Sequence, residues 1–196
     1  MTDVASQTDE ELVSRCQADR DDPRFFEALV RRHQGYVMAN CRSLSRSATD
    51  AEDLAQEVFT KVFFALPRLE PRAPFRGWLT TVKVNHCLNF LRARRGKNWV
   101  ELDDVGAADQ AELATPAEAE RTVEAGELRS VITQALDRLS DTVRVPLVLC
   151  DADGLSYDEI AAQLGIGLSA VKMRIKRGRE EFRRHYAALT AEDARA

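Results

Sequence analysis

One segment of this 196-residue chain combines three kinds of side chain that bind nucleic acids. Residues 75–97, FRGWLTTVKVNHCLNFLRARRGK, begin apolar and aromatic and end strongly basic. Trp78, Asn85 and Asn89 fall at helical spacing, so they share one side of a helix. Aromatic rings stack on bases, amides bond to base edges, and cations pair with phosphates. The segment therefore fits a nucleic-acid surface, and an ordinary core helix with a solvated basic end fits it equally well.

A second basic segment has the layout of a helix-turn-helix. Ser156 and Glu159 have the spacing of a capping box, and a glycine turn at 165–167 precedes a helix that we expect Ser169 to cap. Seven cations lie between Lys172 and Arg184, against two acids. In this motif the second helix enters the major groove, and its first residues meet base edges. A hairpin that is basic only for solubility is the alternative.

Residue type and position predict different DNA contacts along this second helix. Near its start, Ser169, Lys172 and Arg174 are expected to reach bases or nearby phosphates. The later arginines are expected to meet mostly phosphate, and they are Arg177, Arg179, Arg183 and Arg184.

Four carboxylates crowd a single predicted helix, and they are Asp50, Glu52, Asp53 and Glu57. A metal or hydrolytic site needs ligands that converge from several elements, so we expect neither a metal nor a cofactor here. A solvated helix face is the common reading, and a docking face at Asp53, Gln56 and Glu57 is the alternative. No nucleophile–base motif or glycine-rich phosphate loop is present, so no enzyme activity is expected.

The net charge of −4 hides a strongly uneven distribution. Residues 71–99 carry seven cations and no acid, whereas residues 100–128 carry nine acids and one arginine. Local basic clusters, rather than the total charge, set a nucleic-acid footprint. The four cysteines are scattered, which favours reduced thiols, and no apolar run is long enough to cross a membrane. We expect a cytoplasmic protein with no membrane insertion of its own.

The elements that position these groups are all predicted to be helices, because no segment alternates with period two. Apolar periodicity predicts a short helix after Asp9 and longer helices over 25–43, 50–66 and 75–95. Leu54, Val58, Val62 and Leu66 form an apolar stripe, with Phe59 and Phe63 beside them. Helical periodicity returns near residue 127 after an acidic, alanine-rich stretch that is too polar to fold alone.

These motifs in this order resemble a bacterial RNA polymerase sigma factor of the extracytoplasmic-function (ECF) group. The resemblance rests on DAEDLAQEVFTKVFFAL, FRGWLTTVKVNHCLNFLRARR and LSYDEIAAQLGIGLSAVKMRIKRGREEFR, and it covers about residues 25–186. It implies an all-α fold of two small domains. Region 2 is expected at 1–99, a flexible acidic linker at 100–126, a region 4 helix-turn-helix at 127–189 and a tail at 190–196.

The resemblance also implies a function and partners. The protein is expected to bind core RNA polymerase through its β′ clamp helices and β flap, to recognise the −10 and −35 promoter elements, and to help open the DNA. An anti-sigma factor is expected to control it. Asn85 matches a base-reading asparagine and Trp78 an aromatic that supports the base pocket.

Three sets of site residues follow from the residues and the resemblance together. The core polymerase-binding set is Asp50, Asp53, Gln56 and Glu57. The −10 set is Trp78, Lys83, Asn85, His86, Asn89, Arg92, Arg94 and Arg95. The −35 set is Ser156, Ser169, Ala170, Lys172, Met173, Arg174, Lys176, Arg177 and Arg179. The competing hypothesis is a helix-turn-helix regulator that acts without being a polymerase subunit.

Overall fold

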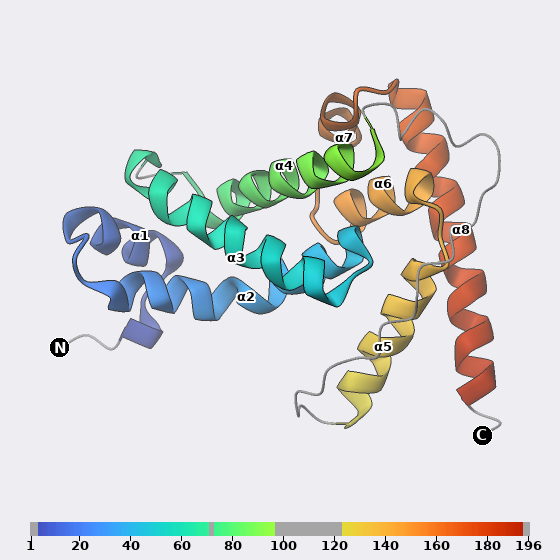
Figure 1. Cartoon of the computed structure of the whole chain (residues 1–196), viewed down its shortest axis with the longest axis horizontal. Coiled ribbons are helices and arrows are strands. Elements are labelled where there is room, and N and C mark those ends of the chain that lie inside the picture. Colours follow the sequence, from blue (N-terminus) through green and yellow to red (C-terminus); the bar gives the residue numbers. More distant parts are fainter. Residues whose placement is uncertain (1–3, 71–72, 97–122, 194–196) are drawn as a thin grey trace. The chain divides into compact units, whose positions relative to one another are not determined.

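The computed structural model describes residues 4–70, 73–96 and 123–193, and all regular structure within those ranges is helical (Figure 1). The predicted all-α fold is thereby confirmed. Contacts divide the chain into two compact units, residues 1–42 with 49–90 and residues 43–48 with 91–196. The domain boundaries predicted above stay predictions, and most of the predicted acidic linker lies outside the described residues.

The first unit begins with a capped helix. After the short 3-10 turn η1 (Val4–Ser6), helix α1 spans Asp9–Ala18. Its cap is Thr8, whose hydroxyl accepts from the Glu11 backbone N–H at 3.2 Å, while the Thr8 N–H donates to the Glu11 carboxylate at 2.8 Å. This reciprocal pair satisfies two backbone donors that a helix start leaves open.

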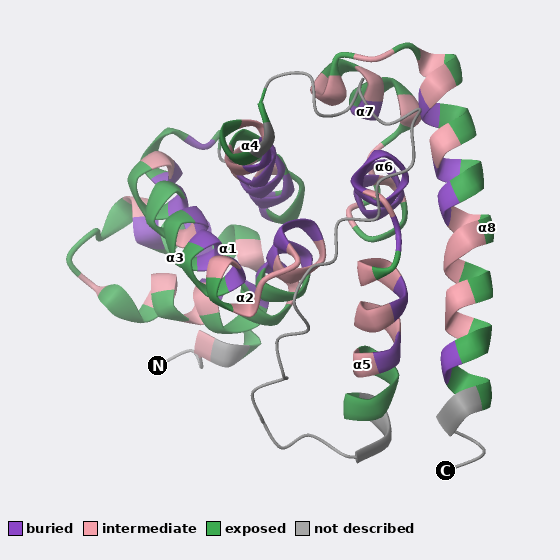
Figure 2. Cartoon of the chain, turned by 45° about the vertical axis from the view of Figure 1, so that its right-hand side comes forward, coloured by how far each residue is buried: buried purple, intermediate pink, exposed green. Residues whose placement is uncertain are grey.

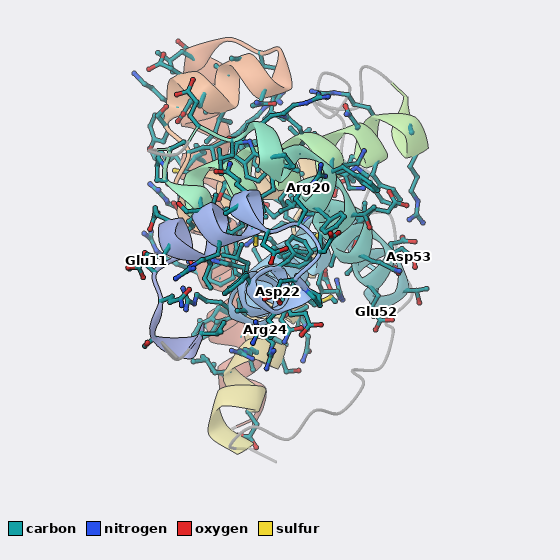
Figure 3. The ribbon with its side chains drawn as sticks, turned by 90° about the vertical axis from the view of Figure 1, so that its left-hand side faces the viewer. Glu11, Arg20, Asp22, Arg24, Glu52 and Asp53 are labelled. Atoms are coloured by element: carbon teal, nitrogen blue, oxygen red, sulfur yellow. The ribbon has the colours of Figure 1, made fainter. Side chains whose placement is uncertain are left out.

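Helix α2 (Pro23–Ser45) starts beside a local ion pair that is visible in Figure 3. Asp22 accepts from the Arg24 backbone N–H at 3.1 Å, and its carboxylate lies 2.6 Å from the Arg24 guanidinium. Further along α2, Arg32 and His33 both approach Asp9 of α1, at 2.6 and 2.8 Å. Because His33 is buried, this contact joins α1 to α2 at the edge of the core.

Most of helices α3 (Ala48–Ala65) and α4 (Phe75–Arg95), with the 3-10 turn η2 (Leu66–Arg68) after α3, completes the first unit. Pro67 lies in that turn, in agreement with the predicted helix stop. Both helices bury one face only, as the purple stripes in Figure 2 show. The largest apolar side chains of their buried faces are Leu54, Val58, Val62, Phe75, Leu79, Leu88 and Leu91.

The second unit contains α5 (Val123–Asp137), α6 (Asp141–Asp151), α7 (Tyr157–Leu164) and α8 (Leu168–Asp193). Helix α8 packs against the other three, and it lies side by side with α5 in Figures 1 and 2. Val131, Ala135 and Leu189 form one part of the core, and Leu139, Val143 and Leu147 form another. Phe182 packs against both parts, so α8 joins them.

Two predictions about α8 need correction. The helix begins at Leu168, so Ser169 lies in its first turn and is not its cap. It also continues to Asp193, although the sequence was interpreted as a tail from residue 190. The turn before it is as predicted, because Gly165 adopts φ +70°, which a residue without a Cβ accommodates without strain.

Gly178 of α8 packs closely against α6. A Cβ at this position would lie 2.9 Å from the Val143 carbonyl oxygen and 3.4 Å from the Leu147 Cβ. The absence of a side chain therefore sets how closely the two helices pack.

Gly178→Ala should lower the free energy of unfolding by about 1–3 kcal/mol, the usual cost of overpacking. The matched control is Gly35→Ala in α2, where an added Cβ meets nothing within 4 Å. That change should raise stability by about 0.5–1 kcal/mol, because glycine is a poor helix former. Urea unfolding followed by circular dichroism measures both, and a loss of the same size in both variants would contradict the close-packing argument.

Candidate functional site

A row of polar side chains faces outward along α3. Asp53, Gln56 and Glu57 are exposed, whereas Asp50 is half-buried at the helix start. Figure 3 shows Asp53 and its neighbour Glu52 projecting from the helix. The opposite side of α3 is held by its buried apolar stripe, so the polar row stands on a rigid support. The predicted docking residues are therefore available for a partner, with Asp50 the least accessible.

The same face of α3 continues into exposed aromatic side chains. Phe64 is 69% exposed and Phe63 is 41% exposed, and the Phe63 ring meets Phe26 edge to face at 5.1 Å. Phe63 was interpreted as part of the apolar stripe, but it lies at the surface. Phe64 lines a shallow hollow of about 540 Å³ together with Thr60, Lys61, Ala65 and Arg68. The exposure of Phe64 could have been predicted from the sequence, because Phe64 lies seven residues after Glu57 and so shares its helix face.

Helix α4 exposes its amides and buries its aromatic residues to different degrees. Asn85 and Asn89, one turn apart, are exposed, and Arg94 is exposed beyond them. Trp78 is half-buried, with its ring 6.0 Å from the buried ring of Phe75. Arg92 is half-buried, and the side chain of Arg95 lies outside the described residues. Six of the eight predicted −10 residues are thus at least partly accessible: Trp78, Asn85, His86, Asn89, Arg92 and Arg94.

Lys83 is fully buried, so the prediction that it touches DNA disagrees with its placement. Its ammonium donates to the Tyr36 hydroxyl at 3.0 Å and lies 4.2 Å from the centre of the Tyr36 ring. The Arg76 guanidinium lies 4.5 Å from the same ring. Leu79 and Cys87, one turn before and after Lys83, are also buried, and that spacing was the signal that Lys83 belongs to the inner face.

His86 of α4 meets Glu57 of α3. The His86 Nε2 lies 2.8 Å from the Glu57 Oε2, and the imidazole is mostly buried whereas the carboxylate is largely exposed. Burial lowers the pKa of His86, the Lys61 cation lowers it further, and Glu57 acts in the opposite direction. These effects together favour the neutral form of the ring. Glu57 was predicted to bind polymerase and His86 to bind the −10 element, and no pattern in the sequence predicted their contact.

The helix-turn-helix of α7 and α8 begins with the predicted capping box. Ser156 donates to the Glu159 carboxylate at 2.7 Å and accepts from the Glu159 backbone N–H at 3.3 Å. These bonds lower the pKa of Glu159. Ser156 is exposed, but its hydroxyl is engaged in the cap, so its first role is structural.

The start of α8 presents an exposed surface of mixed character. Lys172 and Met173 are exposed, Met173 by 72%, while Ala170 and Arg174 are half-buried. One guanidinium nitrogen of Arg174, Nη1, is buried without a hydrogen-bond partner. Ser169 is exposed in the first turn. The residues predicted to reach bases therefore lie together on one end of α8.

Three of the later cations of α8 are paired within the protein. Arg177 donates to Glu181 at 2.7 Å, and Lys176 lies 4.0 Å from Glu180. Arg179 makes a two-point contact with Asp151 of α6, at 3.0 and 2.5 Å. Hydrogen bonding to Arg179 lowers the pKa of Asp151. The Asp151 carboxylate already neutralises much of the Arg179 charge, so Arg179 is a weaker candidate for a phosphate contact than Lys172.

No group of three His, Cys, Asp or Glu side chains in the described ranges is placed to hold a metal ion. No helix in residues 4–70, 73–96 or 123–193 is both long and apolar enough to cross a membrane.

Known proteins match both halves of the chain. The model of Sigma-70 region 2 matches residues 29–97, and that of Sigma-70 region 4 matches residues 129–182. The ECF RNA polymerase sigma-E factor of Escherichia coli (strain K12) is 32% identical over 180 residues, which cover 88% of this chain and 91% of that protein. This chain belongs to the ECF sigma factors of RNA polymerase. The predicted family is thereby confirmed.

Other relatives and structures agree with this assignment. The ECF RNA polymerase sigma factor SigE of Mycolicibacterium smegmatis is 37% identical over 174 residues, 87% of this chain and 65% of that protein. Among solved structures, CnrH in complex with the cytosolic domain of CnrY has 26% identity and a TM-score of 0.53, with 97% and 99% of the two chains covered. The sigma factor RpoE of Bartonella quintana, bound to the anti-sigma factor NepR, has 25% identity and a TM-score of 0.54, with 82% and 95% covered.

A comparison of two α8 cations tests which end of the helix this sigma factor uses on DNA. Lys172→Ala should weaken binding of its polymerase complex to a −35 duplex and reduce the salt slope of log K by about one, because one phosphate contact is lost. Arg179→Ala should lower the slope by less, because Asp151 already engages that guanidinium. Fluorescence anisotropy over a salt series measures both slopes. A larger change for Arg179→Ala would place the DNA contact further along α8.

Proposed function

We propose that this sigma factor binds core RNA polymerase through region 2 and directs it to promoters, with region 4 at the −35 element and region 2 opening the −10 element. The single observation that carries the proposal is that region 2 and region 4 both match, in that order, along one chain. A sigma factor selects and opens DNA, and the polymerase carries out the catalysis. We expect the chain to act where that polymerase works, in the cytoplasm.

Polymerase docking is assigned to the outward face of α3. Asp53 and Glu57 supply charge, Gln56 supplies an amide, and Phe64 adds an exposed aromatic ring on the same face. A large apolar group beside charged side chains is typical of the residues that dominate protein interfaces. This arrangement supports the β′ clamp helices as the partner, as the family resemblance implies.

The −10 contact is assigned to the exposed face of α4. Asn85 and Asn89 present amides one turn apart, and Trp78 offers part of an aromatic surface. An unpaired base needs such groups, because stacking and edge hydrogen bonds repay the few kcal/mol that flipping costs. Arg92 and Arg94 follow on the same helix and carry charge suited to the phosphates of the displaced strand.

Control by an anti-sigma factor is the remaining part of the proposal. The solved relatives CnrH and RpoE are each in a complex, with the cytosolic domain of CnrY and with the anti-sigma factor NepR. Their similarity to nearly the whole of this chain supports a protein partner of the same kind. The alternative of a free-standing helix-turn-helix regulator is not favoured, because it leaves the region 2 match without a role.

The docking face makes one prediction about affinity. Asp53→Ala and Phe64→Ser should each weaken binding to core polymerase by about 1–2 kcal/mol, since each removes an exposed interface group without touching the core. Glu52→Gln is the matched control, because Glu52 projects from the same helix but lies outside the proposed set. Titration of labelled protein with core polymerase measures the affinities. Affinity unchanged in both docking variants would remove the docking assignment.

The −10 assignment makes a prediction about strand opening. Asn85→Ala should reduce promoter opening roughly tenfold or more while −35 duplex binding stays within about twofold, because only the captured base loses a partner. Permanganate reactivity of unpaired thymines measures opening, and gel shift measures duplex binding. Normal opening by the variant would show that Asn85 does not read the base.

A further inference from the structure

The Glu57–His86 contact joins the two proposed functional surfaces of region 2. Glu57 belongs to the polymerase-docking row on α3, and His86 follows Asn85 on α4, the helix assigned to the −10 element. Their Oε2 and Nε2 atoms lie 2.8 Å apart. A group that binds one surface therefore competes for a side chain that also touches the other.

His86 is mostly buried, whereas its partner Glu57 is exposed. The His86 side chain is only 13% exposed, and Nε2 is buried with no well-aligned hydrogen-bond partner in the described residues. A buried polar nitrogen in that situation depends on the nearest negative group, which here is Glu57. Glu57 itself is 62% exposed, so a partner protein can reach the carboxylate from outside.

The charges around His86 determine how the contact would respond to a partner. Burial is the main effect that disfavours protonation of His86, and the Lys61 cation adds to it, so the neutral imidazole has Glu57 as the negative group nearest to Nε2. If a cation of the polymerase paired with Glu57, it would draw the carboxylate outward and leave Nε2 without the negative group nearest to it. The imidazole would then be free to turn toward DNA bound beside Asn85, the residue that precedes His86.

We propose that the Glu57–His86 contact couples polymerase docking on α3 to −10 strand binding on α4, with His86 as the positioning residue. The proposal rests on the proposed function of region 2. Because coupling between two sites is reciprocal, the −10 strand must tighten polymerase binding by the same factor by which polymerase tightens strand binding.

The test is a double-mutant cycle on the full-length protein. The affinity of core polymerase for each variant is measured by fluorescence titration, with and without a saturating single-stranded −10 oligonucleotide. The ratio of the two affinities is the coupling factor. The variants are His86→Leu, which removes the donor, His86→Gln, which retains one, Glu57→Gln and the double variant His86→Leu with Glu57→Gln.

The expected result is a coupling factor that falls by roughly two- to tenfold in His86→Leu and in Glu57→Gln, the lower part of the range seen for residues in contact. The double variant should fall no further than the single ones, and His86→Gln should recover part of the loss. Glu52→Gln should leave the factor unchanged. Circular dichroism checks that each variant is folded. If His86→Leu does not fold, His86→Gln still tests the contact.

The outcomes separate this inference from the function on which it rests. A coupling factor that survives in both His86→Leu and Glu57→Gln, or losses that add in the double variant, would overturn the coupling. If core polymerase does not bind the native protein at all, the proposed function itself fails. If both ligands bind and the coupling factor of the native protein is one, only the coupling is lost.

Discussion

The buried ammonium of Lys83 is the constraint on which the arrangement of α4 depends. A charged group without water is costly unless it is paired, and here the Tyr36 hydroxyl accepts from it. Thr80 donates to the Arg76 carbonyl at 2.9 Å, so the Tyr36 hydroxyl must donate to Thr80, from which it is 2.8 Å away. The result is one continuous hydrogen-bond chain between α2 and α4. Any rotation of α4 would break it, so the chain also sets which side of α4 carries Asn85 and Asn89.

Region 4 reaches its form by a different route, through local backbone chemistry and close packing. The capping box at Ser156 starts α7, and the left-handed Gly165 ends it within a few residues. These two features leave little freedom in where α8 can begin. Gly178 then lets α8 approach α6 closely, and Phe182 bridges the two parts of the core. The exposed start of α8 is thereby held by rigid contacts further along the same helix.

Local signals made much of this fold predictable. Apolar residues three and four apart predicted α2, α3 and α4, because a helix brings such residues onto one face. Ser156 and Glu159 predicted the start of α7, because a capping box needs only four consecutive residues. The outward row at Asp53, Gln56 and Glu57 was predictable for the same reason, since its spacing is a property of the helix alone.

Contacts between helices were not predictable in this way. Lys83 was assigned to DNA from its charge, but its partner Tyr36 lies 47 residues earlier on another helix. Phe63 was assigned to the apolar stripe from its hydrophobicity, but it is 41% exposed, and its ring meets Phe26 of α2 edge to face. The meeting of Glu57 and His86 depends on the angle and offset between α3 and α4, which no local pattern encodes. The sequence by itself determined which residues share a helix face and which family the chain resembles. Only the tertiary structure decided which polar groups face each other, because that depends on how separate helices pack.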